Sequence, residues 1–280
     1  MIEISNLQFM YNKRKRLFDE LNLSCSNGHI YGLLGKNGTG KSTLLHLMSG
    51  LLFPQSGSIV ASGFVPGKRE VAFLQDIFLV PEEFAVPGLT PAKYARLYAS
   101  FYPRFDENQY NEYLNEFEVD TEDPMNKMSM GQRKKTFIAF ALACNTRILL
   151  MDEPTNGLDI PSKTQFRKII ASIATEDRCI VISTHQVRDL ENLIDAVVIL
   201  EGHQIVFNES IDDVASKFSF VSYTDSDKPE QILYDEPGVM GGKSIVPNAK
   251  GNPSRVDMEI LFNAVTSTKK NGNAIFTTKI

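Results

Sequence analysis

The sequence predicts an α/β fold built around a parallel sheet, with a helical insertion and a small C-terminal appendage. A glycine-rich loop, Gly35 to Ser42, lies between an apolar strand and a helix with an apolar stripe. Between residues 147 and 200, predicted strands and helices alternate, which is typical of a parallel sheet covered by helices. Beyond about residue 209 the chain becomes polar and rich in turn-forming residues, so we expect a separate small unit there.

The first 80 residues are predicted to be rich in strands. Short apolar segments indicate strands near Ile2 to Tyr11, Leu17 to Cys25 and Ile30 to Gly35. Further short strands are expected at Ser58 to Ala61 and Val71 to Leu74. The helix expected in this part follows the glycine-rich loop, and its apolar residues keep helical spacing: Leu44, Leu45, Leu47, Met48 and Leu51.

A helical insertion is expected between about residues 82 and 145. Thr90 and Pro91 form a helix-start pair, with the threonine as cap and the proline in the first turn. Asp106 is expected to cap a second helix, and Ser129 is expected to open a third. Apolar side chains recur at helical spacing after each start, which predicts helices with one buried face.

The alternating region that follows contains three predicted strands: Arg147 to Met151, Cys179 to Ser183 and Ala196 to Leu200. Two predicted helices, Ser162 to Ile173 and Val187 to Ile194, lie between them. Strands joined through helices in this way pair in parallel, because each crossover returns the chain to the same edge of the sheet.

A short strand, Gln204 to Phe207, closes this first unit. We therefore expect one domain at residues 1 to 208 and a small accessory domain at residues 209 to 280. The accessory domain keeps three short apolar runs: Phe218 to Tyr223, Ser244 to Val246 and Val256 to Val265.

The composition is that of an ordinary globular protein, with 280 residues, 42% of them hydrophobic and 22% charged. No stretch approaches the ~18 consecutive apolar residues that span a bilayer, and the N-terminus has no secretory pattern, so we expect a cytoplasmic chain. The net charge of -5 argues against a nucleic-acid platform, and no nucleic-acid partner is expected. Two short basic runs, Lys13 to Arg16 and Arg133 to Lys135, are interpreted as solvated faces or partner contacts.

The cysteines and most histidines lack a recognisable motif. The cysteines are interpreted as small core residues and not as a disulfide or metal framework: Cys25, Cys144 and Cys179. The histidines interpreted as structural are His29, His46 and His203.

The loop from Gly35 to Ser42 fits the phosphate-binding pattern GxxxxGK[ST], so the sequence predicts binding of a nucleoside triphosphate. Its glycines let successive N–H groups point toward the phosphates, beside the positive end of the following helix. Lys41 adds a positive charge, and the Ser42 hydroxyl is a ligand suited to Mg²⁺. The residues expected to bind the nucleotide here are Gly35, Asn37, Gly38, Gly40, Lys41, Ser42 and Thr43.

An acidic pair follows the apolar strand Ile148 to Met151. Asp152 is expected to face the Mg²⁺ shell, and Glu153 is expected to orient the attacking water. A phosphate loop alone leaves kinases, GTPases, helicases and transport ATPases open, so the accompanying motifs decide the class.

In these motifs and their order, the first domain resembles the ATP-binding-cassette family. The resemblance implies a P-loop NTPase fold, with a RecA-like parallel sheet core and an antiparallel β subdomain. It identifies Pro154 to Asp159 as the family's D-loop, with Asp159 among the nucleotide-binding residues, and His185 as the switch histidine at the γ-phosphate. It matches Gln75 to the Q-loop glutamine that helps to organise Mg²⁺, and Tyr11 to the aromatic residue that stacks on adenine.

The family's signature motif, LSGGQ, is matched with two departures. Ser129, Gly131 and Gln132 keep the pattern, whereas Met128 replaces the leucine and Met130 the first glycine. In the family, the serine and the following helix amides grip the γ-phosphate bound to the opposite subunit. Met130 would crowd a closed dimer or slow turnover, although ATP hydrolysis is still expected.

The resemblance implies the ATP-binding and hydrolysing subunit of a transporter, by its layout an exporter, with ATP and Mg²⁺ as cofactors. Catalysis is expected from Lys41, Glu153 and His185 in a homodimer or heterodimer of cassettes. A separate transmembrane permease would hold the chain at the inner face of the cell membrane, through the helical insertion and the segment after Gln75. Core packing is the alternative interpretation of the apolar residues there: Phe78, Leu79, Pro81, Phe84 and Val86.

Two other classes are weighed against this one. A soluble cassette protein could use ATP as a conformational switch on ribosomes or DNA. Ribosomal members, however, carry two cassettes in tandem and DNA-repair members insert coiled coils, whereas this chain has one cassette and no heptad run. A P-loop kinase or GTPase would leave Gln75, the Ser129 motif and His185 unexplained together.

Overall fold

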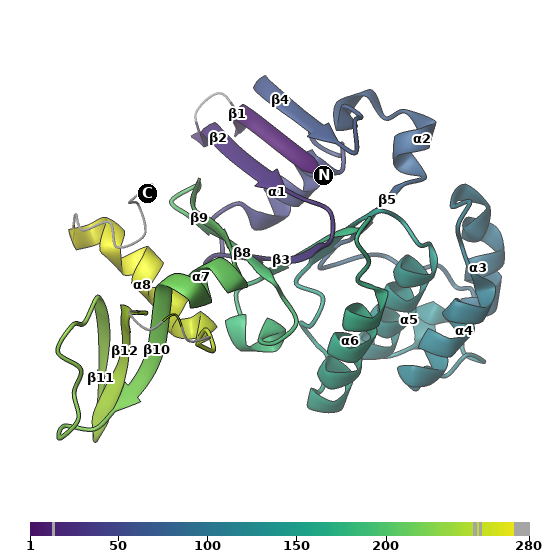
Figure 1. Ribbon diagram of the computed structural model, residues 1–280. Helices are drawn as coiled ribbons and strands as arrows, with labels where there is room; N and C mark the ends of the chain where they lie inside the picture. Colours follow the sequence, from purple (N-terminus) through teal and green to yellow (C-terminus); the bar gives the residue numbers. More distant parts are fainter. Residues whose placement is uncertain (13–14, 249–250, 252–253, 272–280) are drawn as a thin grey trace.

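The computed structural model describes residues 1–12, 15–248, 251 and 254–271. Within these residues the chain forms three sheets, and helices cover both faces of the largest one (Figure 1). The expected α/β class with a parallel sheet at its centre is confirmed.

The largest sheet has six strands in the order β5-β6-β7-β3-β8-β9. Five of them are parallel, and β9 runs antiparallel to β8. The strands are β3 (His29–Leu34), β5 (Ile77–Val80), β6 (Ile148–Asp152), β7 (Cys179–Thr184), β8 (Ala196–Glu201) and β9 (Gln204–Ser210). Both β6 and β7 are buried along their whole length, as continuous apolar runs require when helices cover both faces.

One face of this sheet packs against α1 (Lys41–Met48) and an antiparallel sheet in the order β2-β1-β4. The fully buried side chains of Phe18, Leu33 and Leu44 join these layers in one core. This antiparallel unit is the expected β subdomain. Its strands are β1 (Ile2–Asn12), β2 (Lys15–Cys25) and β4 (Ser56–Ala61).

The helices of the expected insertion and α6 contribute to the core on the opposite face. Two predicted caps are confirmed. Asp106 accepts hydrogen bonds from the amides of Asn108 and Gln109 at 2.8 and 3.1 Å, and Ser129 accepts one from the Gln132 amide at 3.2 Å. The helices are α3 (Pro91–Tyr98), α4 (Glu107–Glu116), α5 (Met130–Ala143) and α6 (Ile160–Ile173).

Two predicted elements are wrong. Val71–Leu74, predicted as a strand, is helix α2, in which the Gln75 amide donates to the Val71 carbonyl at 2.9 Å. The predicted helix from Val187 to Ile194 is a 3₁₀ turn, η4 (Val187–Leu190), and the chain then turns at Asn192, whose φ is 66°. The other 3₁₀ turns are η1 (Pro66–Lys68), η2 (Ala99–Phe101) and η3 (Met125–Lys127).

After β9 the chain forms a third, antiparallel sheet in the order β10-β12-β11. The sequence predicted neither α7 nor β11. Helix α8 contacts this sheet through Ile260 and Ala264, and it joins the main core through Leu261 and Val265. The elements are α7 (Ile211–Lys217), β10 (Phe218–Tyr223), β11 (Tyr234–Gly238), β12 (Gly241–Pro247) and α8 (Met258–Asn271).

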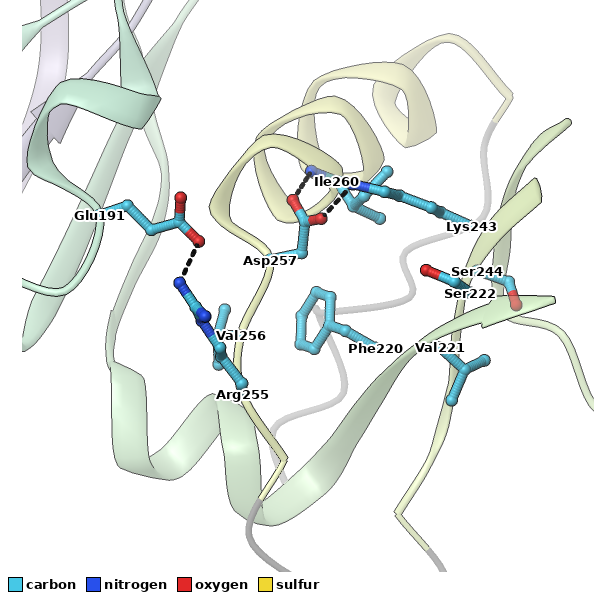
Figure 2. Close-up of a pocket in the computed structure, with 10 residues that line it drawn as sticks. All are labelled: Glu191, Phe220, Val221, Ser222, Lys243, Ser244, Arg255, Val256, Asp257 and Ile260. Atoms are coloured by element: carbon cyan, nitrogen blue, oxygen red, sulfur yellow. Dashed lines mark hydrogen bonds and ion pairs between the residues drawn. The ribbon is translucent and has the colours of Figure 1, made fainter. Parts of the chain in front are cut away.

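Ion pairs surround the start of α8. Figure 2 shows Glu191 facing Arg255, with 3.0 Å between Oε1 and Nη2, and Asp257 bonded to Lys243. The predicted boundary between residues 208 and 209 falls inside β9, and an accessory domain from 209 onward remains a proposal. Residues 272–280 of that domain lie outside the described part. Each helix in the described residues is too short or too polar to span a bilayer.

Candidate nucleotide site

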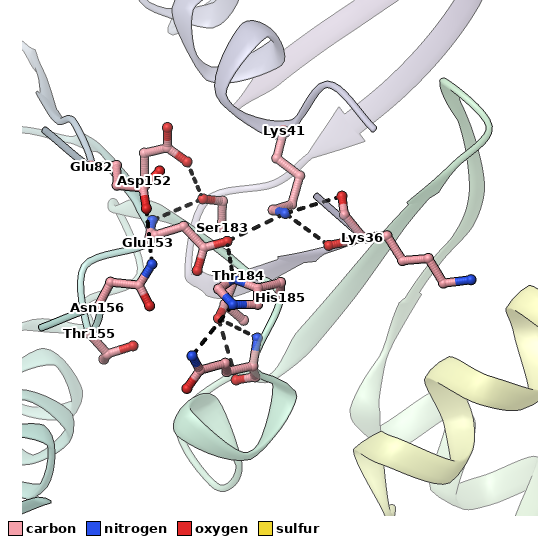
Figure 3. A network of polar contacts seen from close by, with 12 residues as sticks. Lys36, Lys41, Glu82, Asp152, Glu153, Thr155, Asn156, Ser183, Thr184 and His185 are labelled. Atoms are coloured by element: carbon pink, nitrogen blue, oxygen red, sulfur yellow. Dashed lines mark hydrogen bonds and ion pairs between the residues drawn. The ribbon is translucent and has the colours of Figure 1, made fainter. Parts of the chain in front are cut away.

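A cavity of about 630 Å³ opens where the phosphate loop, β6 and β7 end. The carboxyl ends of parallel strands share one edge of the sheet, so segments far apart in the sequence meet there. Figure 3 shows the polar side chains that gather at this edge. The predicted site residues that line the cavity are Tyr11, Asn37, Gly38, Gly40, Lys41, Ser42, Thr43, Glu153 and His185.

The phosphate loop curls through two left-handed glycines, Gly38 at φ 80° and Gly40 at φ 111°. A side chain at Gly40 would also approach the Phe18 ring to 2.7 Å, so both space and backbone conformation require glycine there. Lys41 begins α1 and is buried, and its Nζ donates to the Gly35 carbonyl at 2.8 Å. The first amides of α1 therefore lie at the cavity, where they suit an anion.

Three polar side chains converge on the floor of the cavity. Glu153 Oε1 lies 3.4 Å from Lys41 Nζ and 2.9 Å from His185 Nδ1. The second carboxylate oxygen, Oε2, is buried and has no hydrogen-bond partner among the described residues. A buried acceptor of this kind indicates that a water or ligand belongs beside it.

The backbone at Glu153 is left-handed, with φ 45°. Its amide donates to the Ser183 carbonyl at 3.2 Å and to the Ser183 hydroxyl at 3.1 Å. The same hydroxyl donates to Asp152 Oδ1 at 2.5 Å, and Asp152 is buried at the end of β6. One serine of β7 thus holds both predicted acids in place.

Tyr11 lies at the rim of the cavity. Its hydroxyl is 2.9 Å from Thr43 Oγ1, and its ring packs edge-on against Phe9 with 4.9 Å between centroids. The residue is nevertheless 63% exposed, so a face of the ring is open for stacking.

Gln75 does not lie at this cavity. It follows α2 and precedes β5, at the amino end of the strand, whereas the cavity lies at the carboxyl ends. The pairing of β5 with β6 runs from Ile77 and Ile148 to Val80 and Met151, which separates the two ends by several steps of about 3.3 Å. The predicted place of Gln75 beside the nucleotide and Mg²⁺ is therefore wrong.

Glu82 occupies the position expected of Gln75. It follows β5 at the carboxyl end, lines the cavity, and accepts a hydrogen bond from Asn156 Nδ2 at 3.0 Å. The signal in the sequence was the apolar run Ile77 to Val80, followed by a proline and this acid. From pattern alone, the apolar residues of this stretch indicate a docking segment or core packing, and they do not identify a strand of the central sheet.

The signature residues form a second hollow of about 390 Å³, separate from the first. Ser129 caps α5, and Asp159 caps α6 by accepting from the Ser162 amide at 2.8 Å. Hydrogen bonds from the Ser162 side chain and amide lower the pKa of Asp159. Gly131 and Gln132 line the same hollow, so the predicted site residues fall into two clusters on one chain.

Met130 lies at the rim of the second hollow and is 69% exposed. Its methyl group covers Gly157, where an added Cβ would be 2.6 Å from Met130 Cε. Gly157 has φ 79°, so the turn after β6 requires glycine for its backbone as well.

The interpretation of Arg133 to Lys135 as a solvated face is wrong for two of its members. Lys134 is 4% exposed and Lys135 is 8% exposed. Lys134 Nζ donates to the Glu153 carbonyl, and Lys135 Nζ donates to Ser162 Oγ at 3.3 Å. In the other basic run, residues 13 and 14 lie outside the described part of the chain.

The interpretation of the cysteines as core residues is confirmed, because Cys25, Cys144 and Cys179 are all buried and free. Burial raises the pKa of Cys179 to about 12, and it raises the pKa of the other two thiols as well. His203 also braces the phosphate loop, with its Nδ1 2.9 Å from the Thr39 carbonyl oxygen.

The apolar stretch after Gln75 packs mainly inward. Phe78 belongs to the main core, and Phe84 stacks on Phe137 with 4.4 Å between ring centroids. A groove of about 440 Å³ opens beside Gln75 instead. Exposed apolar residues line it: Leu51, Val71 and Phe101.

Comparisons with known proteins bear on the family of this chain. A sequence model of the ABC transporter family matches residues 18–156. The bacitracin transport ATP-binding protein BcrA of Bacillus licheniformis is 34% identical over 209 residues, covering 72% of this chain and 67% of that protein. The lantibiotic transport ATP-binding protein SrtF of Streptococcus pyogenes is 29% identical over 214 residues, covering 76% and 92%.

Solved structures share the fold. An ATP-binding subunit of an ABC transporter has a TM-score of 0.69 and 24% identity, covering 76% of this chain and 91% of that one. A dimeric bacterial ABC transporter cassette has a TM-score of 0.66 and 23% identity, covering 75% and 98%. The family match and the identity to the bacitracin protein lead to one conclusion: this chain belongs to the ABC transporter family, as one of its ATP-binding subunits, and is an ATPase.

Proposed function

We propose that this chain powers an exporter by hydrolysing ATP and driving a separate membrane-spanning permease. The observation that carries the proposal is the convergence of Lys41, Glu153 and His185 in one cavity at the end of a phosphate loop. Outward transport is supported by a relative named for linearmycin resistance, since removing a toxic compound from a cell is one physical route to resistance.

In this proposal, Lys41 and the amides of the phosphate loop hold the β- and γ-phosphates, and the exposed ring of Tyr11 stacks on adenine. Lys41 Nζ lies 3.4 Å from Glu153 Oε1. A triphosphate competes for the same ammonium because it carries more negative charge. Nucleotide binding therefore frees the Glu153 carboxylate at the moment when it is needed.

The oxygen donors at the cavity fit Mg²⁺. The Ser42 hydroxyl and the carboxylates of Asp152 and Glu82 are hard ligands of the kind that this ion prefers. Asp152 is buried at the strand end, and Glu82 lines the cavity. Bound Mg²⁺ would neutralise charge that develops on the phosphate oxygens.

Glu153 is the proposed group that orients the attacking water. Its Oε1 is shared by Lys41 and His185, which leaves the unpartnered Oε2 to accept a hydrogen bond from that water. His185 then turns from the carboxylate to the γ-phosphate and steadies it.

A complete site in this proposal needs two cassettes. The phosphate loop and the Ser129 cluster line separate hollows of one chain, so each nucleotide is completed by the Ser129 helix of a second cassette. Asp159 lies beside that helix and closes the contact. The pair is a homodimer or a heterodimer, and hydrolysis opens it by cutting the bridging phosphate.

The groove beside Gln75 is the proposed contact with the permease. Its exposed Leu51, Val71 and Phe101 offer an apolar surface between the sheet core and the helical insertion. Docking there would hold the chain on the cytoplasmic face of the membrane. This assignment replaces the apolar stretch after Gln75 as the proposed contact.

The variant Glu153→Gln tests the catalytic proposal. We expect turnover to fall by at least about 100-fold, because a neutral amide cannot act as base. Binding of Mg·ATP should persist, and the ATP-loaded variant should elute as a stable dimer. Glu112→Gln, on the exposed face of α4, is the control and should hydrolyse ATP like the wild type. Rapid steady-state hydrolysis by Glu153→Gln would reject the assigned role.

Capture from detergent-solubilised membranes tests the partner. The tagged chain should retain a polytopic membrane protein, and the groove variant Leu51→Glu should lose it while still binding ATP. Recovery of ribosomes or DNA in place of a membrane protein would instead support a conformational switch without transport.

A further inference from the structure

Helix α5 carries a buried lysine that faces the turn after β6. Lys134 is 4% exposed, and its Nζ donates to the carbonyl oxygens of Glu153 at 2.7 Å and Asn156 at 3.0 Å. A buried ammonium is costly unless acceptors satisfy it, and both acceptors here belong to the turn that presents the Glu153 carboxylate.

These contacts support a strained backbone. Glu153 has φ 45°, a conformation that persists only where the surrounding structure holds it. Its amide is held by Ser183 of β7, and its carbonyl is held by Lys134 of α5. The two peptide groups that flank the Glu153 side chain are thus fixed from opposite sides, by two different elements.

The ammonium also lies among acids. Desolvation lowers the pKa of Lys134, while the carboxylates of Glu82, Glu153 and Asp152 act in the opposite direction. The Asn156 side chain donates to Glu82 at 3.0 Å, so the lysine, the turn and the Glu82 loop form one connected network.

We infer that Lys134 is a positioning residue for Glu153, tying the turn that carries the carboxylate to the helix that Ser129 opens. The inference rests on the proposed role of Glu153. Lys134 and Ser129 are five residues apart on α5, about 7.5 Å along the helix axis. Helix α5 therefore connects two sites. Its first residues complete the nucleotide site of the second cassette, and Lys134 holds the Glu153 turn in the site of the same chain.

This placement predicts an effect on kcat and not on nucleotide affinity. The described residues that line the nucleotide cavity do not include Lys134. Loss of its two hydrogen bonds leaves the phosphate loop intact but lets the Glu153 turn relax toward an ordinary backbone conformation. A displacement of about 1 Å at a reacting group can cost about 100-fold in rate.

The test compares Lys134→Met, Lys134→Gln and Lys134→Arg with the control Arg178→Met. Arg178 is also a partly buried cation that donates to a backbone carbonyl, Ile173 O at 3.1 Å, and desolvation lowers its pKa as well. It lies at the amino end of β7, away from the cavity. The measurements are kcat, KM, the Kd for Mg·ATP and the midpoint of urea unfolding.

We expect Lys134→Met to lose about 100-fold in kcat with an unchanged Kd, and Lys134→Arg, which keeps the donors, to recover most of that loss. Arg178→Met should lose stability but keep kcat. A folded Lys134→Met with wild-type kcat, or with kcat and affinity falling together, would overturn the inference. If Lys134→Met does not fold, Lys134→Gln decides, because its amide nitrogen ends one bond short of the lysine nitrogen and does not reach both carbonyls. Wild-type kcat in that variant would overturn the inference as well.

Glu153→Gln, assayed in parallel, separates this inference from the proposed function. Continued turnover by Glu153→Gln overturns the role of the carboxylate itself. Loss of turnover in Glu153→Gln together with normal kcat in Lys134→Met overturns only the positioning role.

Discussion

The acid proposed to orient water is presented by a backbone that few side chains tolerate. A residue with a side chain at φ 45° costs about 1–3 kcal/mol unless its neighbours favour that conformation. At Glu153 those neighbours are Ser183 and Lys134, which hold its amide and its carbonyl. The left-handed turn points the carboxylate into the cavity immediately after β6, a strand that is buried along its whole length.

Glu82 and Gln75 lie beyond opposite ends of β5, so substitutions of the two can be compared directly. Glu82→Ala removes a carboxylate from the nucleotide cavity, so we expect kcat of the purified chain to fall at least about tenfold, or ~1.4 kcal/mol of barrier. Gln75→Ala should leave the ATPase rate of the purified chain unchanged, since the residue lies at the other end of β5. Steady-state hydrolysis with excess Mg²⁺ measures both. The opposite ranking of the two variants would restore Gln75 to the nucleotide.

The sequence motifs assign Gln75 to the nucleotide site, whereas Glu82 occupies that position in the structure. The reason for this error shows which residues cannot be placed from sequence alone. Both residues follow short apolar runs, Val71 to Leu74 and Ile77 to Val80. Only the pairing of β5 with β6, a contact across about 70 positions, decides which run enters the central sheet. The phosphate loop, the acids after β6 and His185 were predictable, because local pattern fixes each of them.

Met130 is predicted to slow turnover. Its exposed side chain covers Gly157 at the rim of the signature hollow, where a second cassette would have to approach closely. We expect Met130→Gly to raise kcat about fivefold, which corresponds to ~1 kcal/mol of barrier. Met240→Gly, which changes a still more exposed methionine between β11 and β12, is the control. An unchanged or lower rate in Met130→Gly would show that the side chain does not obstruct the closed pair.

At the level of elements, helices with a cap and several turns were predictable, whereas short elements were not. Asp106 and Ser129 predicted the starts of α4 and α5, because a capping side chain is a local signal. The four residues of α2 are too few to show a helical or a strand period. The sequence around β11 is polar and shows no strand pattern. This strand is defined by its pairing with β12.

The contact between η4 and α8 predicts how the C-terminal elements are held. Arg188 Nη2 donates to Glu259 Oε2 at 2.6 Å, and Glu259 lies two residues beyond Asp257, whose side chain accepts from the Glu259 and Ile260 amides at 3.1 Å. We expect Arg188→Glu to release α8 and to speed its proteolysis several-fold, because two carboxylates then face each other. The double change Arg188→Glu with Glu259→Arg should return cleavage to the wild-type rate.

Salt and a distant charge reversal provide the controls for this prediction. Both residues are exposed, so the difference should shrink in about 1 M salt, where charges are screened beyond ~3 Å. Lys228→Glu breaks a pair with Asp235 on the other side of the third sheet and should leave α8 protected. Equal cleavage of Arg188→Glu and the wild type would mean that apolar packing alone holds α8.

In the whole molecule, the arrangement of the central sheet and its covering helices explains why the phosphate loop and the Ser129 cluster lie in two separate hollows of one chain. The central sheet brings the phosphate loop, Glu153 and His185 to one edge, while α5 and α6 carry Ser129 and Asp159 to a different hollow. Apolar cores lie on both faces of the sheet and keep the two clusters apart. The cysteines sit in these cores, and their burial makes stability depend on pH.

The final prediction is a loss of stability in alkali. Burial raises the pKa of Cys25, Cys144 and Cys179, the last to about 12, and it raises the pKa of Tyr102 to about 12. Unfolded thiols titrate near pH ~8.5. Above that pH the unfolded chain releases protons that the folded chain retains, so the free energy of unfolding falls as pH rises. The expected fall is about 2 kcal/mol per buried thiol between pH 8 and 10.

Urea unfolding in reducing buffer at pH 8, 9 and 10 measures this fall. In Cys179→Ala the fall should be smaller by the contribution of one thiol. Equal stability at pH 8 and 10 would contradict the prediction, because it would mean that the thiols reach solvent in the folded chain.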